Sequence, residues 1–130
     1  LPSAHRADPA LFVEVVTHEH QHVVQWRDAK VRMPWLYAKE PEARVKFEVD
    51  AYAAGLAVRQ WLTGRLVTDG DAKRIVASLI ASYHLLPEDG DLASDLLGSH
   101  LASLSQGLVM AEAGREAIRW LTARHPELRG

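Results

Sequence analysis

The sequence predicts an all-α protein: a compact bundle of about five helices. Three observations predict it. Apolar residues recur every three or four positions along most of the chain, proline and glycine separate these stretches, and only Leu66-Val67 has the composition of a strand. The chain has 130 residues, of which 48% are hydrophobic, enough for one core. No repeat, low-complexity tract or linker divides it, so we expect a single domain over residues 1–130.

The first helix is expected to begin at Pro9. Asp8 is a favourable N-cap, and proline is favoured at the first helical position. An apolar face with helical spacing then runs from Leu11 to Trp26. Because a proline disfavours helical geometry in the residue before it, we expect this helix to stop before Pro34.

The remaining elements follow from the same signals. Glu40-Pro41 opens the second helix, and Gly64 is a plausible C-cap for it. Turns with capping residues are expected at 69–71 and 89–91. We expect two helices that form the candidate site, over about 9–63, and three C-terminal helices, over about 71–125. The last four of these five helices are expected at 41–63, 71–86, 92–105 and 110–124. The four tryptophans are interpreted as core anchors, with Trp35 in a loop where it could wall a cleft.

Composition excludes several classes of function. Fifteen basic and 17 acidic residues give a formal charge of −2, which argues against nucleic acid as the main partner. No apolar run approaches the roughly 20 residues of a membrane span. The absence of cysteine excludes disulfides, thiol catalysis and thiolate metal sites. Histidine stands out, with 7 residues in the chain and three of them between positions 18 and 22.

These histidines form a His-Glu-x-x-His motif within the first predicted helix. Four residues of helix turn by about 400°, so His18 and His22 share one face and can bind one Zn²⁺. Glu19 cannot join them as a ligand, but it can reach a water on the metal and act as general base. His20 lies on the opposite face of the helix, where we expect it to be solvated.

A catalytic zinc usually has a third protein ligand, and the second predicted helix offers one. Glu48 is the favoured candidate because it shares a helical face with the small residues Ala51 and Gly55, which would let the two helices approach closely. Asp50 points about 200° away from that face. Other candidates that remain open are Asp50, Glu40, Glu42, His84 and His100.

The residues His18-Glu19-x-x-His22, followed by Glu48-x-x-Ala51, resemble the gluzincin zinc metallopeptidases. The additional Gln25 makes the string similar to that of several bacterial metallopeptidase families. The resemblance covers about residues 11–58. It implies that His18, His22 and Glu48 bind zinc and that Glu19 is the base.

Two features depart from the gluzincin pattern. Tyr52 stands four residues after Glu48, where gluzincins commonly have an Asp or Asn that supports a histidine. Gluzincins also usually have a small sheet before the motif helix, whereas the 17 residues before His18 are expected to be helical. We therefore expect either that the substrate-holding sheet lies upstream of this chain or that the substrate is held differently.

These observations predict a zinc-dependent hydrolase, a metallopeptidase with one Zn²⁺ per chain and a peptide or protein as substrate. Gln25 is expected on the site face, where its amide could fix an imidazole or a substrate carbonyl. Tyr52 or Tyr37 could donate a phenol hydrogen bond to the oxyanion. Two alternatives remain: a non-catalytic helical interaction module that keeps a structural or vestigial zinc site, and a plain helical bundle without metal.

Overall fold

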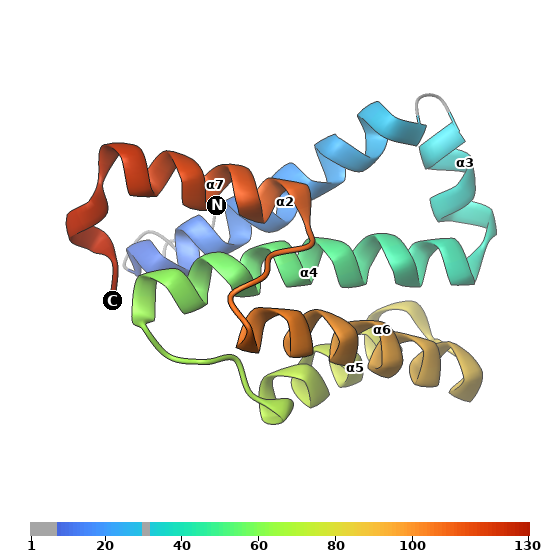
Figure 1. Cartoon of the computed structure of the whole chain (residues 1–130). Helices are drawn as coiled ribbons and strands as arrows, with labels where there is room; N and C mark the ends of the chain where they lie inside the picture. Colours follow the sequence, from blue (N-terminus) through green and yellow to red (C-terminus); the bar gives the residue numbers. More distant parts are fainter. Residues whose placement is uncertain (1–7, 30–31) are drawn as a thin grey trace.

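The computed structural model describes residues 8–29 and 32–130, and these residues contain six α-helices, one short 3₁₀ helix and no strand. The all-α prediction is therefore confirmed. Along the chain in Figure 1 the elements are α2 (Pro9–Ala29), α3 (Arg32–Lys39), α4 (Pro41–Thr63), α5 (Asp69–Tyr83), α6 (Pro87–Ser105), α7 (Glu112–Arg124) and the 3₁₀ helix η1 (Pro126–Leu128).

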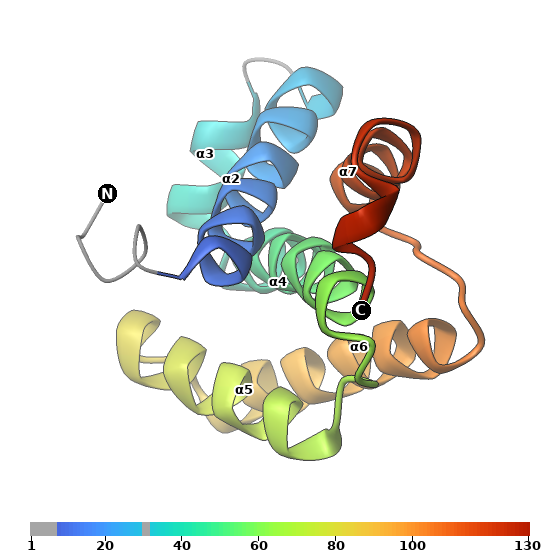
Figure 2. The ribbon, with the colours of Figure 1, turned by 90° about the vertical axis from the view of Figure 1, so that its left-hand side faces the viewer.

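Helix α4 lies at the centre of the bundle. Helices α2, α3 and α7 pack on one side of it, and the α5–α6 pair lies on the other (Figure 2). Its residues 51 and 53–58 are all buried, and most of them are small. A Cβ added to Gly55 would lie 2.9 Å from the backbone oxygen of Glu14, and one added to Gly114 would lie 3.2 Å from that of Ala54. Small residues therefore let α2 and α7 approach α4 closely.

Local signals explain most helix ends. The Asp8 carboxylate accepts hydrogen bonds from the backbone N–H groups of Ala10 and Leu11, as expected of an N-cap. Gly64 closes α4 with a φ of 68°, a left-handed conformation that glycine adopts without strain. At the start of α5, Thr68 and Asp71 form a capping box, in which each side chain bonds the other residue's backbone N–H.

Some boundaries differ from the prediction, one because proline was interpreted too strictly and two because Asp-Gly-Asp was interpreted as a turn. Pro34 lies in the first turn of α3, a helix that the sequence analysis did not predict, and a residue there needs no backbone N–H for the helix. Helix α5 begins at Asp69 and α6 at Pro87, so the turns expected at 69–71 and 89–91 lie at the starts of these helices, where acidic residues are favourable. Trp35 consequently lies on a helix and not in a loop.

The interpretation of the tryptophans as core anchors was wrong for three of the four, whereas Trp61 is partly buried. Trp26, Trp35 and Trp120 are each more than half exposed. The core is instead aliphatic, and its largest fully buried side chains are Leu56, Leu97, Val45, Val49 and Val58. None of the helices in the described part of the chain combines the length and apolar character of a membrane span.

Candidate metal centre

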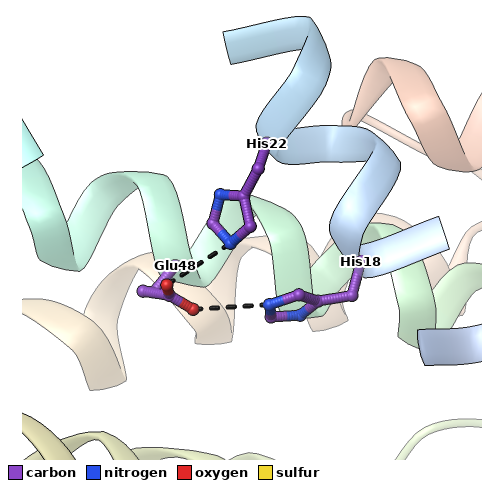
Figure 3. A group of neighbouring side chains, drawn as sticks. All are labelled: His18, His22 and Glu48. Carbon is purple, nitrogen blue, oxygen red and sulfur yellow. Dashed lines mark ion pairs between the residues drawn. The ribbon is translucent and has the colours of Figure 1, made fainter. Parts of the chain in front are cut away.

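The motif histidines lie side by side in the middle of α2. Both side chains are partly buried and project toward α4 (Figure 3). Their direction follows from the helix register, because Gln21 and Gln25 on the neighbouring stripe of α2 are buried against the bundle. His20 is exposed, as expected for a residue on the other face.

Glu48 of α4 lies between the two histidines. Its Oε2 is 3.4 Å from Nε2 of His18, and its Oε1 is 3.3 Å from Nε2 of His22. The three side chains each offer a ligand atom, and these atoms lie within 4.8 Å of one another. In the part of the chain that the structure describes, this is the one cluster of three or more His, Asp or Glu side chains that could hold a metal ion.

The donor set and its dimensions fit zinc. Two imidazole nitrogens and a carboxylate oxygen are common Zn²⁺ ligands. A tetrahedral zinc with bonds of about 2.0–2.1 Å holds its ligand atoms about 3.3 Å apart. The distance from Oε2 of Glu48 to Nε2 of His18 is close to that separation, and one ligand atom from each of the three residues lies within 4.8 Å of the others. Small movements of the side chains would therefore suffice to bind an ion.

The other candidate ligands lie elsewhere. Asp50 points away from the cluster and forms an ion pair with His100, with 2.9 Å between Oδ1 and Nε2. Glu42 pairs with Lys46 on the surface of α4. Glu40 and His84 are exposed. The structure thus brings only Glu48, of the candidates considered, to the two histidines.

Gln25 determines which nitrogen of His22 faces the cluster. Its Nε2 donates to the backbone oxygen of Phe47 at 2.8 Å, so its Oε1 must be the atom that lies 2.8 Å from Nδ1 of His22. Because an amide oxygen can only accept, Nδ1 of His22 carries the hydrogen. Nε2 is therefore the nitrogen that faces Glu48: in the protonated ring it donates to the carboxylate, and in the neutral ring it has the lone pair that a metal ion needs.

Two tyrosines, one from α3 and one from α5, contact Glu48. The hydroxyl of Tyr37 (α3) donates to Oε1 of Glu48 at 2.5 Å, and that of Tyr83 (α5) lies 3.2 Å from the same oxygen. The two hydroxyls are 2.5 Å apart. The Arg44 guanidinium lies over both rings, 5.5 and 5.3 Å from their centroids.

These contacts determine the electrostatics of the cluster. Burial acts to raise the pKa of Glu48, but hydrogen bonds from His18, His22 and Tyr37 outweigh it and hold that pKa far below its usual range. The hydrogen bond to Glu48 likewise raises the pKa of His22, although burial opposes it. Burial and the neighbouring Glu48 raise the pKa of Tyr37, so its hydroxyl stays protonated and keeps its role as donor.

Glu19 and Tyr52 lie beside the cluster, not within it. Glu19 is exposed and lines a cleft of about 270 Å³ together with His18, Tyr52, Leu11, Glu14, Val15 and Gly55. The Tyr52 ring packs edge to face against His18, with 4.4 Å between ring centroids. Burial raises the pKa of Tyr52. The cleft therefore joins the metal cluster to the carboxylate and the phenol that the sequence singled out.

The contact of Tyr83 with Glu48 was not predicted from the sequence, and Tyr37 has a different partner from the oxyanion that was expected. Along the chain, 35 positions separate Tyr83 from Glu48. No local spacing could have linked the two residues. Tyr37 was considered as an oxyanion donor, but in the structure its hydroxyl contacts Glu48.

Comparison with protein families, curated proteins and solved structures finds no match to this chain. Of the features that resemble gluzincins, the structure shows the two motif histidines on α2 close to Glu48 on α4. Together these residues form a possible metal-binding cluster.

Proposed function

We propose that this chain is a zinc-dependent hydrolase, specifically a metallopeptidase, that holds one Zn²⁺ through His18, His22 and Glu48. The observation that carries the proposal is the meeting of these side chains from α2 and α4 beside an open cleft. A hydrogen bond to one of the proposed ligands gives further support. Gln25 bonds His22, as outer partners of histidine ligands commonly do in metal sites.

A bound Zn²⁺ would polarise the carbonyl group of a substrate and lower the pKa of a water molecule. Glu19 is the proposed general base. It takes a proton from the water as the water oxygen bonds to the peptide carbonyl carbon, and it gives that proton to the leaving amine nitrogen as the C–N bond breaks. In support, Glu19 directly follows His18 on α2 and lines the same cleft.

The proposed substrate is a peptide or protein. The cleft is smaller than a pocket for a whole drug-sized ligand, so its size suits one side chain next to the bond that is cleaved. Tyr52 is the proposed donor to the oxyanion, because its protonated phenol belongs to this cleft.

Metal content and peptide hydrolysis test the proposal together. We expect about one zinc per chain in the wild type and in His20→Ala, which removes an exposed histidine of the same helix, and none in His18→Ala. Glu19→Gln should keep its zinc and lose hydrolysis of a fluorogenic peptide library. Equal zinc in wild type and His18→Ala would contradict the metal site, and full activity of Glu19→Gln would remove Glu19 from its role.

One observation favours a second candidate, a helical interaction module that keeps a zinc site without turnover. The described residues include no strand that could hold an extended peptide by backbone hydrogen bonds. A zinc-loaded wild type that cleaves no member of a broad peptide library would favour this candidate over the hydrolase.

A further inference from the structure

The hydroxyls of Tyr37 and Tyr83 meet at a single atom, Oε1 of Glu48. A carboxylate oxygen has two lone-pair sites, and two phenol donors are enough to occupy both. Each oxygen of Glu48 also has one histidine contact, Oε1 with Nε2 of His22 at 3.3 Å and Oε2 with Nε2 of His18 at 3.4 Å, but among the described residues only Oε1 has phenol partners. The two oxygens of Glu48 therefore have different environments.

Oε1 of Glu48 and the two tyrosine hydroxyl oxygens form a group of three oxygens, and both phenol hydrogens lie within it. Tyr37 donates to Glu48, and Tyr83 donates either to Glu48 or to the hydroxyl of Tyr37, 2.5 Å away. Neither hydrogen is then free for a substrate, which separates these tyrosines from Tyr52. Arg44 holds the arrangement in place, since it lies over both rings and its Nε donates to the backbone oxygen of Tyr37 at 2.8 Å.

We propose that Tyr37 and Tyr83 are positioning residues that hold Oε1 of Glu48, so that Glu48 offers only Oε2 to the metal. This inference rests on the proposed zinc site. Its consequence is functional, because a carboxylate that binds through one oxygen leaves a coordination position for water or substrate, as catalytic zinc sites require. The metal centre would then need four helices: α2 and α4 supply the ligands, and α3 and α5 hold one of them in position.

Metal affinity and coordination number test the proposal in the full chain. The variants are Tyr37→Phe and Tyr83→Phe, which remove one hydroxyl each. Tyr52→Phe is the matched control, because Tyr52 packs on His18 and makes no hydrogen bond to Glu48 in the described structure. Zinc affinity is measured by competition with a chromophoric chelator, and the coordination number from the visible absorption of the Co²⁺-substituted protein.

We expect Tyr37→Phe to bind zinc roughly 10–100-fold more weakly than the wild type, the usual effect of losing an outer partner of a metal ligand. Tyr83→Phe should show a smaller loss because its bond to Glu48 is longer. In Tyr37→Phe the freed Oε1 should join the metal. The Co²⁺ absorption should therefore weaken from the intense bands of a four-coordinate ion toward those of a five-coordinate one. Tyr52→Phe should keep both the affinity and the spectrum.

The alternative results separate the two proposals. Unchanged affinity and an unchanged Co²⁺ spectrum in both Tyr37→Phe and Tyr83→Phe would overturn the positioning role while the zinc site stands. A wild type that binds neither ion would overturn both. The expected spectra together with a wild type that cleaves no peptide would support the positioning role and remove the proposed hydrolase activity.

Discussion

At the residue scale, the orientation of His22 depends on Gln25. The amide of Gln25 bridges Nδ1 of His22 and the backbone oxygen of Phe47, and so links α2 to α4 at the level of the metal cluster. The ring of the motif histidine is thereby held in one orientation, with Nε2 toward Glu48, before any ion binds. The energetic advantage is that ordering of the ring is completed during folding and not during metal binding.

We therefore expect Gln25→Leu, which keeps a side chain of similar size without the amide, to bind zinc roughly 10–100-fold more weakly. His22 would lose its partner at Nδ1 and could rotate or present the wrong nitrogen. Chelator competition measures the effect, with His20→Ala as a control that leaves the cluster intact. An unchanged affinity in Gln25→Leu would show that the bond to His22 is dispensable.

Glu14 gives a pH-dependent prediction at the same scale. Burial raises the pKa of its carboxyl, although Arg59, 3.8 Å away, opposes the shift. A carboxyl whose pKa is raised by folding stabilises the protein fully only below its unfolded pKa of about 4.3, and this stabilisation is lost as the pH rises through the folded pKa. Glu14→Gln has no carboxyl to ionise. The free energy of unfolding of Glu14→Gln minus that of the wild type should therefore be larger, meaning a relatively more stable variant, at pH 7 than at pH 4.

Urea unfolding at the two pH values, with a chelator present, measures this difference. Glu116→Gln, which removes an exposed glutamate of α7, controls for the loss of one negative charge. If the free energy of unfolding of Glu14→Gln differs from that of the wild type by the same amount at both pH values, ionisation of Glu14 does not destabilise the fold.

At the element scale, α4 has to accept neighbours on several sides, and its small residues make this possible. Gly55 touches the backbone of α2, and Gly114 of α7 touches the backbone of α4 at Ala54. Close backbone approach brings α2 near enough for His18 and His22 to reach Glu48. The close contact at Gly55 and the metal cluster therefore both lie between α2 and α4.

We expect Gly55→Ala to destabilise the protein. The new Cβ would meet the backbone oxygen of Glu14 at 2.9 Å, and the cost of such overpacking, about 1–3 kcal/mol, exceeds the gain of up to about 1 kcal/mol from replacing a helical glycine. Gly98→Ala is the matched control, because its Cβ would meet nothing within 4 Å. That variant should be about 0.5–1 kcal/mol more stable. Chemical denaturation distinguishes the two, and a stabilised Gly55→Ala would contradict the close approach.

At the scale of the whole molecule, the metal cluster joins parts of the chain that are distant in sequence. Its ligands come from α2 and α4, and the tyrosines on Glu48 come from α3 and α5. Unfolding separates these groups. An ion that binds the folded chain alone must therefore stabilise the whole fold.

Zinc should accordingly raise the thermal midpoint of the wild type. Once free zinc exceeds the Kd, each tenfold increase should add about 1.4 kcal/mol to the free energy of unfolding. The midpoint of His18→Ala should not respond. Thermal unfolding in zinc buffers, and again after removal of the metal by a chelator, checks this expectation. Equal midpoints for the wild type with and without zinc would argue against a site formed by folding.

The helical class and most helix ends could be predicted from the sequence because their causes are local. Apolar spacing, the Asp8 cap and the left-handed Gly64 act within a few residues. The error at Pro34 also has a local cause, since proline is compatible with the first turn of a helix. The pairing of His18 with His22 follows in the same way from the 3.6-residue repeat.

Tertiary structure decided the rest. The rotation of α4 about its axis relative to α2 directs Glu48, and not Asp50, toward the histidines. Asp50 instead pairs with His100, 50 positions away. The hydroxyl of Tyr83 reaches Glu48 across 35 positions for the same reason. The sequence by itself determined the helices and the motif, because hydrogen bonds and side-chain spacing within a helix involve near neighbours. The packing of the helices decided which carboxylate completes the cluster and which phenols hold it, because those contacts join residues that only the folded core brings together.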